Sequence, residues 1–256
     1  MTATRVRIAA VSYLNTIPFI YGIEHAGKLQ AELLLSPPAG CAETFNSGQA
    51  DIALIPVGAL PEIQNAKIIT SYCLGAQSGV RSVVLASNSP LKDIRTLYLD
   101  SHSRTSVLLT RYLAVKRWDI APEWKELTDY SVVDSPAEGD AFLLIGDKVF
   151  PREGQFRYWW DLSDEWHAQT KLPFVFAVWV AREGVDAEVL DALEESLTFG
   201  LERTWEAIAE YKYDHLPYAY DYLTRNMDYL FDAQKRKALG KFWNDGLKTT
   251  LRINPG

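Results

Sequence analysis

The chain has 256 residues, enough to bury a substantial core as one large domain or as two lobes. Hydrophobic residues make up 48% of it and charged residues 23%, which is typical of a soluble globular protein. The net charge of −7 argues against a nucleic-acid surface, because backbone phosphates require concentrated Lys and Arg.

The opening stretch, MTATRVRIAAVSYLN, carries too short an apolar run for a secretory signal peptide. No window of the sequence approaches the length of a membrane span. Two cysteines, Cys41 and Cys73, form neither a disulfide framework nor a zinc motif. We therefore expect a cytoplasmic protein that does not insert into a membrane.

Apolar, β-rich runs alternate with helical runs through the first part of the chain. Strands are predicted at residues 5–11, 31–37, 51–57 and 67–74. A helix opened by Pro18 and ending near Gly27 follows the first strand, and a short helix ending at Gly48 follows the second. This alternation predicts an α/β fold with parallel pairing and right-handed crossovers.

The alternation of strands and helices begins again after the apolar run at residues 79–87. The predicted elements are a strand at 95–100, a helix at 105–118, strands at 124–130 and 140–150, a Trp-rich helix at 158–172, and a strand at 174–182. No Pro/Gly-rich linker separates the two halves, so we expect strands to run through the join. The predicted domains are lobe 1, at 1–84 plus 178–256, and lobe 2, at 85–177, with a ligand cleft between them.

The last third of the sequence is helical. Apolar residues at i, i+3 and i+4 spacing predict one long helix over 190–208, and further helices are expected at 217–230 and 232–251. We expect these helices to pack around the first lobe.

Ligands of open α/β sheets bind beyond the carboxyl ends of the strands, where helix N-termini offer unpaired N–H groups. In this chain the rule selects several loops. They hold Ser12–Thr16, Gly40 and Cys41, Pro56 and Val57, Ser101–Ser106, and Gly146–Lys148.

The sequence Ser103-Arg104-Thr105-Ser106 is the most informative of these loops. One hydroxyl can serve as a helix cap, but the cluster holds more hydroxyls than a cap needs. The Arg104 guanidinium suits a carboxylate ligand. This pattern predicts a binding site for the carboxylate of a small organic acid.

Other candidates have competing structural roles. Asn15, in the loop Ser12 to Thr16, can orient a substrate hydroxyl or cap the helix that starts near Pro18. Arg81, beside Ser82, can face the ligand or pair with a surface carboxylate. Asp147 is a candidate base, although the more common role for such a carboxylate is a salt bridge, here with Lys148 or Arg104.

The sequence lacks the signatures of several common chemistries. The four histidines show no metal-ligand spacing, and there is no GxGxxG, P-loop or GxSxG motif. We therefore expect neither a metal nor an organic cofactor.

Several segments, read in order over residues 5–182, resemble the chorismate dehydratases of the futalosine route to menaquinone. They are VSYLNTIPFIYG, GQADIALIPV, SYCLGAQSGVRSVVLAS, LDSHSRTSVLLTRYL, FLLIGDK and DEWHAQTKLPFVFAVWVAR. The resemblance implies a two-lobed fold like that of type II periplasmic solute-binding proteins. Each lobe would hold a mixed, mostly parallel sheet flanked by helices, with a helical C-terminal tail.

The implied reaction converts chorismate to 3-[(1-carboxyvinyl)oxy]benzoate and water, a carbon–oxygen lyase reaction without metal or organic cofactor. For this reaction we expect catalytic roles for Asn15, Ser82 and Asp147. We expect the following residues to bind substrate: Ser12, Thr16, Cys41, Pro56, Arg81, Ser103, Arg104, Thr105, Ser106 and Gly146.

Two other functions remain open at this stage. One is a cytoplasmic binding protein of the same fold that captures a small carboxylate without converting it. The other is the sister dihydroxynaphthoate synthase, which has a Pro-Asn-Asp pattern where this chain has Ser12 to Thr16. Chorismate is the expected partner, and assembly as a homodimer is left open.

Overall fold

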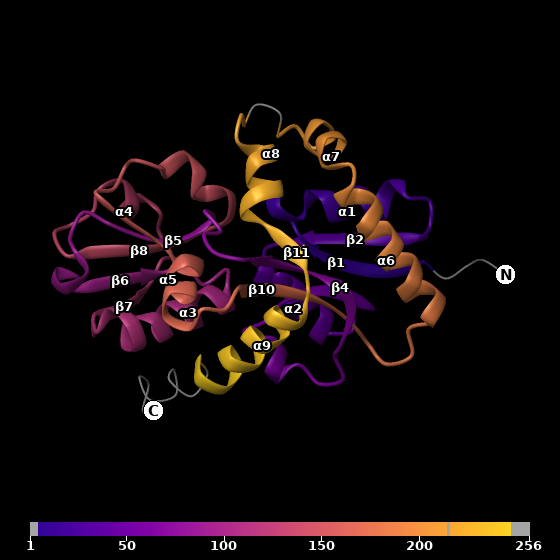
Figure 1. Cartoon of the computed structure of the whole chain (residues 1–256), viewed down its shortest axis with the longest axis horizontal. Helices are drawn as coiled ribbons and strands as arrows, with labels where there is room; N and C mark the ends of the chain where they lie inside the picture. Colours follow the sequence, from indigo (N-terminus) through magenta and orange to yellow (C-terminus); the bar gives the residue numbers. More distant parts are fainter. Residues whose placement is uncertain (1–4, 214–215, 247–256) are drawn as a thin grey trace. The chain divides into compact units, whose positions relative to one another are not determined.

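The computed structural model describes residues 5–213 and 216–246, which form two compact units (Figure 1). Unit 1 lies within Met1–Gly75 and Val175–Asp232, and unit 2 within Ala76–Phe174 and Ala233–Gly256. The chain passes between the units three times, after Gly75, after Phe174 and after Asp232.

Unit 1 is built on a six-stranded mixed sheet of order β11-β4-β10-β3-β1-β2. Its strands are β1 (Val6–Val11), β2 (Ala31–Ser36), β3 (Ile52–Pro56), β4 (Lys67–Ala76), β10 (Phe174–Ala181) and β11 (Asp228–Leu230). Strand β1 pairs in parallel with β2 and β3, whereas β10 pairs antiparallel with β3 and β11 with β4. Every residue of β3 is buried, as its unbroken apolar sequence predicts.

The described residues of unit 1 form five α-helices. They are α1 (Ile17–His25), α2 (Pro38–Asn46), α6 (Ala187–Leu201), α7 (Thr204–Glu210) and α8 (Ala219–Asp221). Helices α1 and α6 approach so closely that neither has room for a side chain at the contact. A Cβ on Gly22 would lie 1.9 Å from the Ser196 carbonyl oxygen, and one on Gly200 would lie 1.8 Å from the Pro18 carbonyl oxygen. Glycine at both positions therefore sets the distance between these two helices.

Unit 2 is built on a five-stranded mixed sheet of order β7-β6-β8-β5-β9. Its strands are β5 (Val83–Ser87), β6 (Thr96–Leu99), β7 (Glu123–Glu126), β8 (Asp140–Ile145) and β9 (Tyr158–Asp161). Its helices are α3 (Arg104–Leu113), α4 (Ser131–Asp134), α5 (Leu162–Thr170) and α9 (Ala233–Lys241). Strand β6 runs parallel to β7 and β8, and β5 runs antiparallel to β8 and β9.

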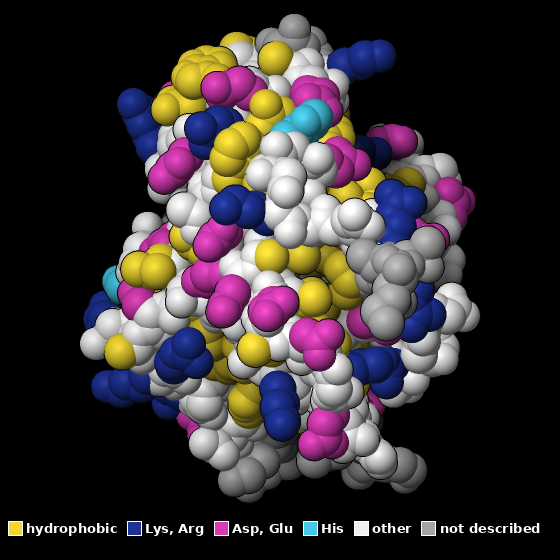
Figure 2. Space-filling view, turned by 90° about the vertical axis from the view of Figure 1, so that its right-hand side faces the viewer, with side chains coloured by type: hydrophobic (Ala, Val, Ile, Leu, Met, Phe, Trp, Pro, Cys, Tyr) yellow, Lys and Arg dark blue, Asp and Glu magenta, His cyan; other side chains and the backbone are white. Residues whose placement is uncertain are grey.

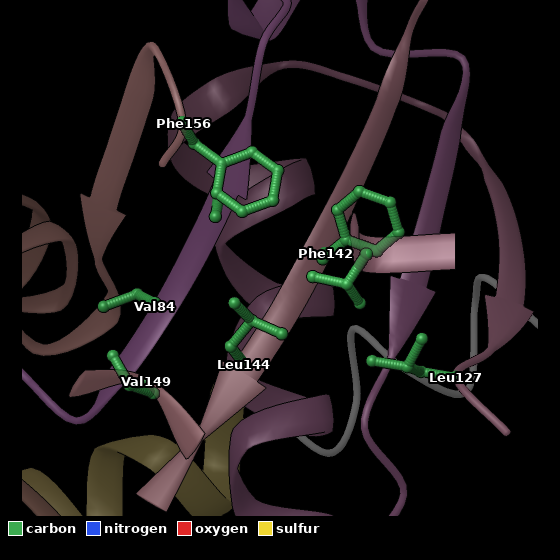
Figure 3. Packing of buried hydrophobic residues seen from close by; sticks show 8 residues of the cluster. Val84, Leu127, Phe142, Leu144, Val149 and Phe156 are labelled. Carbon is green, nitrogen blue, oxygen red and sulfur yellow. The ribbon is translucent and has the colours of Figure 1, made fainter. Parts of the chain in front are cut away.

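A buried apolar cluster covers one face of the unit 2 sheet (Figure 3). It comprises Val84, Ala86, Leu127, Val133, Phe142, Leu144, Val149 and Phe156. The members from β5 and β8 are alternate residues of their strands, so they point to the same face. This packing fixes the strands whose ends carry the candidate site of unit 2.

The division into units corrects the predicted domains at their boundaries and at the C-terminal segment. The boundaries fall at Gly75/Ala76 and Phe174/Val175 rather than after residues 84 and 177. Residues 233–246 belong to unit 2, not to the first lobe, because the Phe242 ring packs edge-on against Trp166 and Phe174. The end of the helix predicted at 232–251 lies outside the described residues.

Three predicted helices are also corrected. Residues 158–161 form β9, and the Trp-rich helix begins only at Leu162. The helix predicted over 190–208 is two helices, which divide between Leu201 and Thr204. The segment 217–230 is a short helix and a π-helical turn followed by β11.

Figure 2 shows one face of the molecule, with Lys and Arg intermingled with Asp and Glu. Neither sign of charge forms a continuous field on this face. It therefore offers no basic stripe of the kind that tracks a nucleic-acid backbone. Across residues 5–213 and 216–246, each helix is too short or too polar to cross a lipid bilayer.

Candidate functional sites in the two units

Strand register brings several predicted residues of unit 2 to one edge of its sheet. The carboxyl ends of β6 and β8 lie at this edge because the two strands are parallel. The start of β5 joins them, since Val83 pairs with Ile145 in the antiparallel ladder. The backbone N–H of Gly146 donates to the Ser82 carbonyl oxygen at 2.8 Å. Ser82 and the turn from Gly146 to Lys148 are therefore held side by side.

The loop 101–106, which we term the anion loop, leads from β6 into helix α3 at the same edge. Ser103 caps the helix, because its Oγ accepts from the Ser106 N–H at 3.3 Å. The same Oγ lies 2.9 Å from the Ser106 hydroxyl. Thr105 and Ser106 are each 1% exposed. The helix N-terminus thus combines N–H groups with buried hydroxyls, a combination that suits a carboxylate ligand.

The two arginines predicted to bind substrate differ in their surroundings. The Arg81 guanidinium forms two hydrogen bonds with the Glu153 carboxylate, at 2.6 and 2.8 Å. Arg104 is exposed at the first residue of α3. Arg81 therefore pairs with a carboxylate, which is the alternative to ligand binding that the sequence allowed. Arg104 lies within the anion loop.

The backbone of Arg81 is held in a left-handed conformation, with φ of 67°. Its N–H donates to the Asp161 carboxylate at 2.5 Å. The same carboxylate accepts from the N–H groups of Ser163 and Asp164, so Asp161 also caps helix α5. Burial raises the pKa of Asp161 to about 6, although these hydrogen bonds act in the opposite direction. Asp161 thereby fixes the backbone directly before Ser82.

Asp100, at the end of β6, lies at the centre of a charged network in unit 2. Its carboxylate accepts hydrogen bonds from the Lys148 ammonium group at 2.7 Å and from the Tyr130 hydroxyl. It also accepts from the backbone N–H of His102 at 3.0 Å. Asp147 is half-buried in the same turn as Lys148.

The predicted residues of unit 1 gather at the carboxyl ends of its parallel strands. Ser12 follows β1, Cys41 lies in the helix after β2, and Pro56 ends β3. The Ser12 N–H donates to the carbonyl oxygen of Ser36, the last residue of β2, at 3.1 Å. The ends of β1 and β2 are thus tied together, and β3 pairs in parallel with β1 beside them.

Asn15 does not cap helix α1, whose first residues include Pro18 and whose start has no side-chain cap. Its Oδ1 instead accepts from the Thr16 hydroxyl at 3.1 Å. Its carbonyl oxygen accepts from the Tyr229 hydroxyl at 3.0 Å. Tyr229, in β11, is buried, and this burial raises its pKa well above the usual range. The hydroxyl therefore remains a donor, and it anchors the Asn15 loop.

Cys41 is fully buried, with its sulfur 3.3 Å from the Ser36 hydroxyl. Burial raises its pKa to about 11, so the side chain is a thiol at neutral pH. Both Cys41 and Cys73 are free. In this structure Cys41 packs the start of α2 against the end of β2.

Within the described part of the chain, one group of side chains has the composition of a metal site. Glu24, His25 and Glu210 bring ligand atoms within 4.8 Å of one another, and all three are exposed. His25 already contacts Glu210 at 2.8 Å, and Glu24 accepts from the Tyr211 hydroxyl. The group lies outside the predicted site residues.

Sequence reasoning missed four residues that support these sites. Asp100 had a signal, since it ends the apolar strand 97–99 next to the anion loop. Tyr130 and Tyr229 had none, because their partners are distant in sequence. Asp161 had the local signal of a helix cap, but its bond to Arg81 joins residues 80 positions apart.

The fold defines the class of protein. AF1704 from Archaeoglobus fulgidus superposes with a TM-score of 0.79 at 20% identity, covering 98% of this chain and 100% of that one. The alkanesulfonate-binding protein SsuA from Xanthomonas axonopodis pv. citri, bound to MOPS, gives 0.67 at 12% identity, covering 100% and 96%. CA3427 of Candida albicans, described as having the generic periplasmic binding protein fold, gives 0.58 at 15% identity, covering 98% and 95%. The chain therefore has a periplasmic-binding-protein-like fold.

The family follows from the sequence. Residues 6–246 match the family described as menaquinone biosynthesis. The protein belongs to this menaquinone-biosynthesis family.

Proposed function

We propose that the protein is a chorismate dehydratase, a carbon–oxygen lyase of the futalosine pathway that acts in the cytoplasm. Membership of the menaquinone-biosynthesis family supports this proposal. The observation that carries it furthest is the anion loop. Its helix N-terminus, with Thr105 and Ser106 each 1% exposed, suits the carboxylate of a small acid.

In the proposed reaction, C3 of chorismate loses a proton and C4 loses its hydroxyl as water. The electron pair of the C3–H bond becomes the new C3=C4 bond, and the ring becomes aromatic. Aromatisation supplies the driving force, so the protein mainly has to hold the ring in a reactive pose. Hydrogen bonds to the ring carboxylate stabilise the charge delocalised from C3.

The roles of the side chains follow from this chemistry. The anion loop takes one carboxylate, and Ser82 takes the other carboxylate or the departing hydroxyl. Asn15 orients the C4 hydroxyl. The enolpyruvyl carboxylate of the substrate is the proposed proton acceptor, and Asp147 is the protein group that could replace it.

The direct experiment is to incubate the purified protein with chorismate and analyse the products by mass spectrometry. The proposal predicts a benzoate product that is one water lighter than chorismate. A protein that binds chorismate without converting it would be a binding protein of the same fold. Conversion of a futalosine derivative instead would identify the sister dihydroxynaphthoate synthase.

A further inference from the structure

The carboxylate of Asp100 is one of the least exposed charges in the described part of unit 2. Its side chain is 1% exposed, and it lies directly before the anion loop. An ionised carboxylate at this depth is tolerated only when it is paired and hydrogen-bonded. Burial acts to raise its pKa, but hydrogen bonds from Lys148 and Tyr130 outweigh burial and hold the pKa below its usual value.

The ammonium group of Lys148 makes two hydrogen bonds within this network. It donates to the Asp100 carboxylate and to the Tyr130 hydroxyl, each at 2.7 Å. It also lies 3.3 Å from Nδ1 of His102. The Nδ1 atom also lies 2.8 Å from the Asp100 carboxylate, to which it donates, so it does not accept from Lys148. Two of the three ammonium hydrogens are therefore used within the network, by Asp100 and Tyr130.

The network connects two loops that carry proposed substrate contacts. Asp100 and His102 precede Ser103, the cap of α3, whereas Lys148 closes the turn that begins at Gly146. Tyr130 lies between them in sequence and adds a third anchor just before helix α4. The ion pair is neutral as a whole, so it links the loops without cancelling the positive end of α3.

We infer that Asp100, Lys148 and Tyr130 are positioning residues that lock the anion loop to the turn 146–148 in its carboxylate-binding form. This inference rests on the proposed function, in which the anion loop receives a carboxylate of the substrate. Removing the Lys148 charge leaves the buried Asp100 carboxylate with only the half-exposed His102 ring as a basic neighbour. We expect the loop to move so that water can reach the carboxylate.

The test compares Lys148→Met, Lys148→Arg and the double variant Asp100→Asn/Lys148→Met with the unmodified protein. Lys148→Met should raise the KM for chorismate about tenfold or more while kcat falls less. Lys148→Arg should restore the KM to within about threefold. Lys125→Met is the matched control, because Lys125 pairs with Glu123 on exposed parts of the same unit. It should leave the KM unchanged.

The double variant separates positioning from stability. It removes both charges and should recover the thermal midpoint that Lys148→Met loses, yet its KM should stay raised. A double variant with the KM of the unmodified protein would overturn the inference, because the pair would then contribute to folding alone.

Amide hydrogen exchange of the ligand-free proteins tests this inference without chorismate, and therefore independently of the proposed function. Lys148→Met should speed amide exchange within residues 101–106 and 146–148, whereas Lys125→Met should not. If the unmodified protein neither binds nor converts chorismate, the proposed function fails on that result. Unchanged exchange in Lys148→Met would overturn the inference whichever substrate the protein uses.

Discussion

The hydroxyl of Tyr229 donates a hydrogen bond to the carbonyl oxygen of Asn15 at 3.0 Å, although the two residues are 214 positions apart in sequence. A three-residue edge strand thus anchors the loop that carries a proposed catalytic residue.

Replacing Tyr229 with Phe removes this anchor while keeping the ring that packs edge-on against Phe19. We expect the free energy of unfolding to fall by about 1 kcal/mol. We also expect kcat/KM for chorismate to fall by roughly tenfold, because small errors in orientation are costly. Steady-state kinetics and chemical denaturation measure the two effects.

Tyr72→Phe is the matched control, since it loses a hydrogen bond to Thr198 within the same unit. It should cost similar stability and leave kcat/KM nearly unchanged. Equal losses of activity in the two variants would contradict an anchoring role for Tyr229.

Asp161 makes stability depend on pH in a defined direction. Its pKa in the folded protein is about 6, raised by burial from 3.8. The folded state therefore binds the proton more tightly than the unfolded chain between these values. Protonation of Asp161 therefore stabilises the folded state. This stabilisation is fully present below about pH 4 and is lost as the pH rises through about 6. The loss amounts to roughly 2–3 kcal/mol.

Asp161→Asn should flatten this part of the stability profile between pH 4 and 7. Thermal midpoints measured across that range, beside those of Asp93→Asn at an exposed side chain of the same unit, isolate the effect. A profile for Asp161→Asn that keeps the slope of the unmodified protein would show that another group titrates in this window.

Cys41 should resist alkylation in the folded protein. With its pKa at about 11, roughly one thiol in a thousand is ionised at pH 8, and the sulfur is also buried. Iodoacetamide should modify both cysteines in urea and neither in native buffer, as read by mass spectrometry. Rapid native labelling that disappears in Cys41→Ser would instead identify a reactive thiol.

Asp147→Asn decides between two proton acceptors. If the enolpyruvyl carboxylate removes the C3 proton, as we expect, turnover should fall by less than about tenfold. Rapid-quench measurements of a single turnover give the rate of the chemical step. A loss of several orders of magnitude would make Asp147 the base.

Phe142 lies within the buried cluster of unit 2 and is 0% exposed (Figure 3). Phe142→Ala should reduce the free energy of unfolding by about 3–5 kcal/mol, because it leaves a cavity. Val115→Ala, at a side chain that is 44% exposed, should change it by less than about 0.5 kcal/mol. Urea denaturation of both variants gives the comparison, and a small loss for Phe142→Ala would mean that the cluster can collapse around the gap.

Most strands could be predicted from the sequence because buried strands are continuous apolar runs. The runs at 51–57 and 174–182 predict β3 and β10 to within a residue or two at each end. Strand β9 was missed because its four residues adjoin a helix of similar composition. Strand β11 was missed because its three residues form a strand only by pairing with β4.

The same distinction between local and distant contacts applies to the sites. The cap at Ser103 was predictable, since its hydroxyl accepts from the backbone N–H only three residues further along the chain. The network around Asp100 joins residues 30 and 48 positions apart, and no local pattern encodes such a pairing. Local contacts such as helix caps could therefore be predicted from the sequence, whereas contacts between distant residues could not.

The close approach of α1 and α6 makes the Asn15 loop sensitive to changes outside it. Pro18 is three residues from Asn15, and its carbonyl oxygen occupies the space that a Cβ at Gly200 would need. A single methyl group at Gly200 would clash with this oxygen and displace the start of α1 together with the Asn15 loop. A genetic screen for inactive variants should therefore recover changes at Gly22 and Gly200, and these would resemble active-site lesions although neither glycine has a functional group to offer.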